Sequence, residues 1–186
     1  MRTARAIPTG GFTMRIGFIG AGFIAKFQAS AMRFVRGADL TGVYAIKGAD
    51  ELAAYAKSNG LGDCKVYGSV AELCKNSDAV AVLAPNFARV EIVSQIADAV
   101  KAGAALKGVM PLGRTVAEAK ELVRLMKEAK MPTAYFENQI HMKAVKNALK
   151  QLAPVAKEMG PVALARSAEA HAGPHEGWFR DPTRQG

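Results

Sequence analysis

Three small residues near the start of the chain have the spacing of a phosphate-binding turn. Gly20, Gly22 and Ala25 follow the short run 15–19 and match the pattern G-x-G-x-x-G/A. In this pattern the first glycine permits a tight turn, and the second lets the backbone approach a pyrophosphate. The third small residue lets a helix pack closely on a strand, and the helix N-terminus stabilises the phosphate charge. The motif predicts a dinucleotide site, and the alternative is a small-residue turn of another α/β protein.

The end of the next predicted strand lacks the carboxylate that NAD sites usually carry. That carboxylate binds the ribose 2′-hydroxyl and lies about 20 residues beyond the glycines. Here the run 43–47 ends in Lys47, and the first acidic residue is Asp50. Because a cation suits a 2′-phosphate, Lys47 favours NADP over NAD as the cofactor. The alternative is an ordinary solvated lysine.

The rest of the chain has the alternating pattern that such a turn requires. Apolar runs predict strands over 15–19, 40–46, 65–67, 79–84, 105–110 and 132–137. Between them, helices are predicted over 23–35, 50–58, a short stretch from Ser69, 90–102 and 115–130. This alternation indicates an α/β fold with a doubly wound parallel sheet. Beyond it, the sequence predicts a helix over 142–152 interrupted near Pro154, a strand over 161–170, and a loop over 171–186.

The apolar pattern also predicts how two of these elements are buried. The helix predicted over 23–35 carries Ile24, Phe27, Ala31 and Phe34 on one apolar face. The run 79–84 is apolar throughout, which is typical of a central strand in a parallel sheet.

Composition excludes several classes of protein. The chain has 186 residues, of which 50% are hydrophobic and 22% charged, so disorder, collagen and a disulfide scaffold are not expected. Its net charge of +9 favours anionic partners, but the basic residues are scattered beside acids, so no nucleic-acid partner is predicted. Cys64 and Cys74 are expected to be free thiols in a cytoplasmic protein. Residues 1–13 are interpreted as a flexible leader. A secretory signal is the alternative for a longer stretch, because basic residues precede the apolar run 16–25 and Ala29-Ser30-Ala31 resembles a cleavage site.

The histidines do not indicate a metal site. His171 and His175 have a metal-like spacing, but Gly173 and Pro174 argue against the helix that would bring them together. No metal, and no membrane-spanning segment, is predicted. His141 is a candidate for a proton donor, with a structural or exposed histidine as the alternative.

Four motifs in order resemble those of the Gfo/Idh/MocA oxidoreductases: Gly17–Gly22, Asp78–Asn86, Pro111–Gly113 and Trp178–Asp181. The resemblance implies an N-terminal dinucleotide-binding Rossmann domain over 14–138. It also implies that 139–186 is the incomplete beginning of a C-terminal α+β domain that serves substrate binding and oligomerisation. It further implies NAD or NADP as cofactor, a sugar, polyol or related carbonyl as the small-molecule substrate, and homo-oligomers when the C-terminal sheet is complete.

The resemblance also assigns cofactor-binding residues by position. Gly20, Gly22, Phe23 and Ile24 would meet the phosphates, and Ala84, Pro85 and Asn86 would lie beside the dinucleotide. The further candidates are Arg89, which could contact a phosphate or be solvated, and Trp178 and Arg180, which could cover the cofactor or anchor a loop.

The chain departs from the family in ways that leave its catalytic acid or base unidentified. Arg89 stands where the family usually has a histidine, and the Glu-Lys pair that usually precedes Pro111 is absent. Lys107 cannot replace that lysine, because it lies four residues before Pro111, which is roughly 13 Å along an extended strand. Either the protein lacks these residues or the sequence omits them, and a Met110–Pro111 Cα distance near 3.8 Å indicates the former. The alternative to an enzyme is a catalytically inactive dinucleotide-binding module or remnant. A methyltransferase is a weaker alternative, because the Pro85-Asn86 motif speaks against it.

Overall fold

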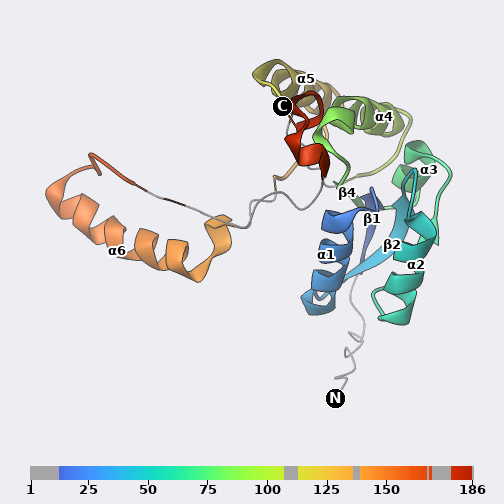
Figure 1. Cartoon of the computed structure of the whole chain (residues 1–186), viewed down its shortest axis with the longest axis horizontal. Coiled ribbons are helices and arrows are strands. Elements are labelled where there is room, and N and C mark those ends of the chain that lie inside the picture. The colour runs from blue at the N-terminus through green and yellow to red at the C-terminus, as the bar shows by residue number, and fades with distance from the viewer. Residues whose placement is uncertain (1–12, 107–112, 136–138, 167, 169–176, 186) are drawn as a thin grey trace. The chain divides into compact units, whose positions relative to one another are not determined.

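The computed structural model describes residues 13–106, 113–135, 139–166, 168 and 177–185. Its centre is a four-stranded parallel sheet in the order β3-β2-β1-β4 (Figure 1). The strands are β1 Met14–Ile19, β2 Ala38–Tyr44, β3 Lys65–Val66 and β4 Ala79–Val82. This parallel order with β1 in the interior confirms the predicted doubly wound α/β fold.

Helices connect the strands and continue beyond them. They are α1 Phe23–Ala31 with the 3₁₀ turn η1 Met32–Phe34, α2 Ala49–Ser58, α3 Val70–Lys75, η2 Asn86–Ala88, α4 Arg89–Lys101, α5 Val116–Glu128, η3 Gln139–His141, α6 Lys143–Met159, η4 Gly177–Arg180 and α7 Pro182–Gln185. The chain divides into two compact units, Met1–Tyr135 with Trp178–Gly186, and Phe136–Gly177. The predicted domain boundary after residue 138 stays a prediction.

Helices cover the sheet on both faces. On one face, α1 and α2 enclose a core that includes Phe18, Leu40 and Val43. On the other face, α3, α4 and α5 pack around a second core that includes Ile19 and Val82. Burial of each such side chain contributes about 1.5–3 kcal/mol to the free energy of unfolding. The two cores therefore stabilise the sheet whose strand ends carry the glycine turn.

The predicted apolar face of α1 is wrong. Phe27 and Phe34 are 60% and 84% exposed, whereas Ala25 and Ala29 are fully buried. Only small side chains fit between α1 and the sheet, because the glycine turn brings the helix close to β1. The large apolar residues therefore face outward.

Several predicted boundaries also differ. Residues 105–106, 132–135 and 161–166 form no strand, and the remainder of those three predicted strands includes 107–110 and 136–137, outside the described residues. A strand requires a hydrogen-bonded neighbour, which an apolar run alone does not supply. The predicted interruption near Pro154 is wrong, because α6 continues through this residue. None of the residues of α6 is buried, so water can bind the carbonyl oxygen that a helical proline leaves without a donor. No helix among the described residues is long and apolar enough to cross a bilayer.

Both cysteine thiols are expected to resist modification in the folded protein. Cys64 and Cys74 are free and buried, and burial raises the pKa of each thiol to about 11. At pH 8 only about one thiol in a thousand is then a thiolate, the reactive form. We expect slow labelling by an aromatic disulfide reagent at pH 8 and rapid labelling of two thiols in guanidinium chloride. Rapid labelling without denaturant would contradict this burial.

Candidate cofactor site

Gly20 lies where three strands meet, and the fold itself requires a glycine there. Its backbone has φ +111°, which favours glycine, and its N–H donates to the Tyr44 carbonyl oxygen over 2.8 Å. A Cβ at this position would lie 2.8 Å from the carbonyl oxygen of Leu83, which follows β4. The turn after β1 therefore packs directly against the carboxyl ends of β2 and β4.

Gly22 has no such structural requirement. It precedes α1 with an extended backbone, φ −74° and ψ −165°, and an added Cβ would meet no atom of a described residue within 4 Å. No described side chain caps α1 here, and its first turn contains no acidic residue. The structure therefore leaves open space beside an uncapped helix N-terminus, which is the arrangement that an anionic group requires.

The loop that carries Lys47 lies beside this turn. Ile19 and Tyr44 are paired at the ends of β1 and β2, and a Cβ on Gly48 would lie 3.6 Å from the Cβ of Ala21. Lys47 is exposed and forms no ion pair with a described residue. The structure thus places Lys47, the residue predicted to bind a 2′-phosphate, at the same edge of the sheet as the glycines.

The predicted residues after β4 complete this edge. The Leu83 N–H donates to the Ile19 carbonyl oxygen over 2.8 Å, which fixes the end of β4 against β1. Ala84 and Pro85 follow, partly buried, and Asn86 begins η2. Together with Phe23 and Ile24 at the start of α1, these residues line the carboxyl edge of the sheet, where ligands bind in open α/β folds.

Arg89 is packed and not extended into water. Its side chain is half-buried, and its Nε donates to the Ala84 carbonyl oxygen over a long 3.4 Å. Burial lowers the pKa of the guanidinium, and the nearby Tyr135 phenol opposes that shift. Arg89 thus packs partly against the turn after β4, and its contact with a phosphate stays a prediction. The sequence has no signal for this electrostatic interaction with Tyr135.

The segment 177–185, predicted to be a loop, contains η4 and α7. Trp178 and Arg180 lie in η4, the Arg180 side chain is exposed, and α7 contacts η2 (Figure 1). Arg114 donates to the Glu118 carboxylate and to the Thr183 carbonyl oxygen. The hydrogen bond from Arg114 lowers the pKa of the Glu118 carboxyl. The signal for α7 was Asp181-Pro182, because aspartate is a favoured N-cap and proline a favoured first helical residue.

The remaining predicted positions lie in the other compact unit or outside the described residues. His141 is exposed in η3, which belongs to the other unit. His171, His175 and the junction of Met110 with Pro111 lie outside the described residues. The described residues include no cluster of metal-ligating side chains.

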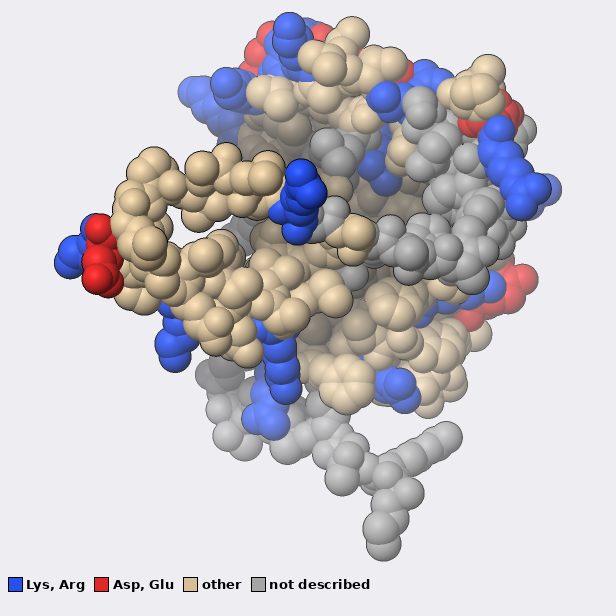
Figure 2. Space-filling view, turned by 60° about the vertical axis from the view of Figure 1, so that its left-hand side comes forward, with Lys and Arg blue, Asp and Glu red and all other residues tan. Residues whose placement is uncertain are grey.

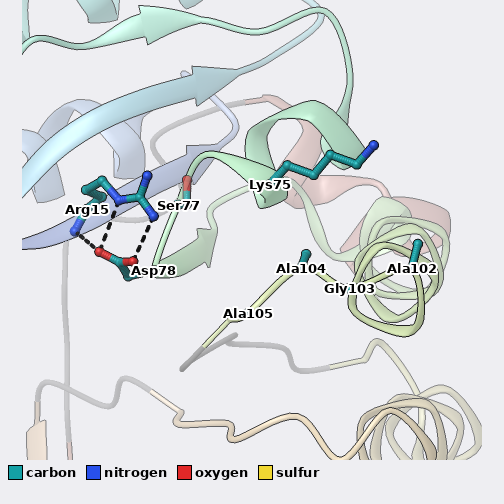
Figure 3. Close-up of a pocket in the computed structure, with 8 residues that line it drawn as sticks. All are labelled: Arg15, Lys75, Ser77, Asp78, Ala102, Gly103, Ala104 and Ala105. Carbon is teal, nitrogen blue, oxygen red and sulfur yellow. Dashed lines mark hydrogen bonds and ion pairs between the residues drawn. The ribbon is translucent and has the colours of Figure 1, made fainter.

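A hollow of about 380 Å³ lies at the opposite, amino edge of the sheet. There Arg15 at the start of β1 pairs with Asp78 before β4, through the Arg15 backbone N–H at 2.7 Å and its Nη2 at 2.9 Å (Figure 3). Asp78 raises the pKa of the Arg15 guanidinium, and Lys75 points away from the pair. These charges join β1 to β4 and are separate from the glycine turn.

Positive side chains do not gather in one patch on the face shown in Figure 2, where acidic side chains lie among them. On α5, for example, Arg124 pairs with both Glu121 and Glu128. The absence of a nucleic-acid partner stays a prediction.

Solved structures share this fold. UDP-N-acetylglucosamine 3-dehydrogenase GnnA from Acidithiobacillus ferrooxidans is 22% identical with a TM-score of 0.61, and the match covers 77% of this chain and 44% of that one. The scyllo-inositol dehydrogenase from Lactobacillus casei is 18% identical with a TM-score of 0.62, covering 78% and 43%. GenD2 from gentamicin A biosynthesis, solved in complex with NAD, is 17% identical with a TM-score of 0.63, covering 82% and 42%. The chain thus spans less than half the length of these proteins.

Family membership rests on a broader match. No curated protein is similar enough to count as a relative. The Gfo/Idh/MocA family model, described as an oxidoreductase family with an NAD-binding Rossmann fold, matches residues 14–137, which include the glycine turn and the edge after β4. The chain therefore belongs to the Gfo/Idh/MocA oxidoreductase family and carries its NAD-binding Rossmann fold.

Proposed function

We propose that the chain binds NADP or NAD at the carboxyl edge of its sheet, as part of an oxidoreductase acting on a sugar, polyol or related carbonyl substrate. The observation that carries the proposal is the open space over Gly22 beside the uncapped start of α1. This arrangement fits a pyrophosphate, because backbone N–H groups and the helix dipole both favour negative charge there. The bound nicotinamide would supply hydride transfer to or from the substrate carbon.

Every predicted cofactor-binding residue except Arg89 has a direct role in this proposal. The phosphates are held by the glycine turn and the start of α1, that is by Gly20, Gly22, Phe23 and Ile24. Lys47 contacts the adenosine ribose. The nicotinamide half of the dinucleotide lies beside Ala84, Pro85 and Asn86. Trp178 and Arg180 are proposed to approach the cofactor from the segment that leads into α7, which contacts η2. No described residue is assigned as the acid or base that handles the substrate proton.

Binding and turnover test the proposal separately. We expect calorimetry to show that the 186-residue chain binds NADPH or NADH, and reduction of the oxidised cofactor to follow for at least one sugar or polyol in a panel that includes inositols and nucleotide sugars. Absence of binding for both cofactors would rule out the dinucleotide site.

The second candidate is a dinucleotide-binding module without catalysis. The sequence favours it at one point, since no Glu-Lys pair precedes Pro111. Tight cofactor binding without turnover on any substrate of the panel would support this candidate over the enzyme.

Lys47→Glu is expected to weaken NADPH binding by about tenfold and NADH binding by less than about twofold. The substitution removes a charge-assisted contact to the 2′-phosphate and adds repulsion, whereas NADH has no 2′-phosphate. Calorimetric dissociation constants for both cofactors check the ratio. Lys127→Glu, at an exposed position of α5, makes the same charge change and is expected to leave the ratio unaltered. Equal effects of Lys47→Glu on both cofactors would exclude the role.

A further inference from the structure

Arg89 occupies an unfavourable place for a cation. It is the first residue of α4, where the helix dipole is positive, and cations are normally stabilised at the other end. The side chain is also half-buried, and desolvation of the guanidinium lowers its pKa. Positions where a chain departs from local preferences in this way are commonly functional.

The Arg89 side chain ties together the two ends of the turn after β4. Its Nε donates to the Ala84 carbonyl oxygen, five residues earlier, across the turn that contains Pro85 and η2. Ala84 in turn adjoins the glycine turn, because a Cβ on Gly20 would lie 3.0 Å from the Ala84 nitrogen. The position of Ala84 therefore determines both the turn after β4 and the room beside Gly20.

The location of this contact indicates which half of the dinucleotide it affects. In Rossmann folds the adenosine ribose lies at the end of β2, so the other half of the dinucleotide extends across β1 toward β4. Lys47 is on the β2 side, and Ala84 and Arg89 are on the β4 side.

We propose that Arg89 is a positioning residue for the nicotinamide half of the cofactor. By holding the Ala84 carbonyl, Arg89 sets the turn of Ala84 to Ala88 against which that half lies. This inference rests on the proposed function and assigns the β4-side turn a specific part in it.

Comparison of two ligands tests the inference. ADP-ribose contains every part of NADH except the nicotinamide, and 2′-phospho-ADP-ribose has the same relation to NADPH. With the full chain and calorimetry, Arg89→Met is expected to weaken NADH binding about tenfold and ADP-ribose binding less than about twofold. A purely structural loss would weaken both ligands equally. Arg89→Lys keeps the charge and a donor, and is expected to bind NADH within about threefold of the wild-type chain.

Controls separate the outcomes. Arg36→Met removes an exposed arginine before β2, at the amino edge of the sheet, and should change neither affinity. If Arg89→Met fails to fold by circular dichroism, the same ratio is measured with Arg89→Gln. Equal loss for both ligands, or no loss for either, would overturn the inference while the proposed function stands. A wild-type chain that binds neither ligand would overturn the proposed function and the inference with it.

Discussion

Gly22→Ala is expected to weaken binding of NADH and NADPH by about a hundredfold or more while the protein folds normally. The new methyl group would enter the open space beside the start of α1 and displace the pyrophosphate from the backbone N–H groups. Loss of two charge-assisted hydrogen bonds corresponds to about this change in affinity. The free energy of unfolding should change by less than about 1 kcal/mol, because the φ of −74° suits alanine and no atom of the described part of the chain lies near the new methyl group.

Calorimetry measures the affinity, and urea denaturation without cofactor measures the stability. A Gly22→Ala protein that binds either cofactor as tightly as the wild-type chain would show that the open space is not the phosphate site. An unfolded variant would contradict the structural result that Gly22 has free space around it.

Gly20→Ala is expected to have the opposite profile, with a loss of about 3 kcal/mol or more in the free energy of unfolding. Its φ of +111° strains any L side chain, and the added Cβ would lie 2.8 Å from the Leu83 carbonyl oxygen. Relief would require the turn to move away from β4, which also carries the core residue Val82. The denaturation midpoint in urea should fall in proportion.

Gly37→Ala is the matched control for this prediction. Gly37 also has a positive φ, +74°, but an added Cβ there would meet nothing within 4 Å among the residues that the structure describes. It should therefore cost only about 1 kcal/mol, the conformational part of the penalty. If Gly20→Ala cost no more than Gly37→Ala, the close approach between the turn and β4 would have no energetic weight.

The sequence predicts the turns at the carboxyl edge of the sheet better than it predicts the packing around them. The spacing of Gly20, Gly22 and Ala25 predicts the turn after β1, because phosphate binding and close helix packing allow few residue types at these positions. The placement of Lys47 follows from the same motif, since β2 must end beside β1 in this topology. The packing of Arg89 does not follow, because a helix-starting arginine has the same local pattern whether it is solvated or folded back onto a carbonyl.

The faces of α1 show the limit of periodicity. Phe27 and Phe34 have the spacing of a core stripe, yet the distance between α1 and β1 admits only alanines such as Ala25 and Ala29. Apolar runs such as 161–166 indicate strands only when a partner strand is present, and that depends on residues distant in the sequence. Helix starts are easier to predict: Ser69 and Thr115 each precede a glutamate by three residues, which is a capping-box pattern, and each caps its helix, α3 or α5.

The strand order of the sheet has a consequence for synthesis of the chain. β1 is made first, yet its partner β4 lies 63 residues later at the point where Arg15 meets Asp78. At a translation rate of about 5–20 residues per second, β4 is synthesised about 3–13 s after β1, whereas β2 follows β1 much sooner. Pairing therefore starts with β1 and β2, and the nascent chain exposes the second edge of β1 until β4 leaves the ribosome. A chaperone that shields apolar strand edges would have this interval in which to act.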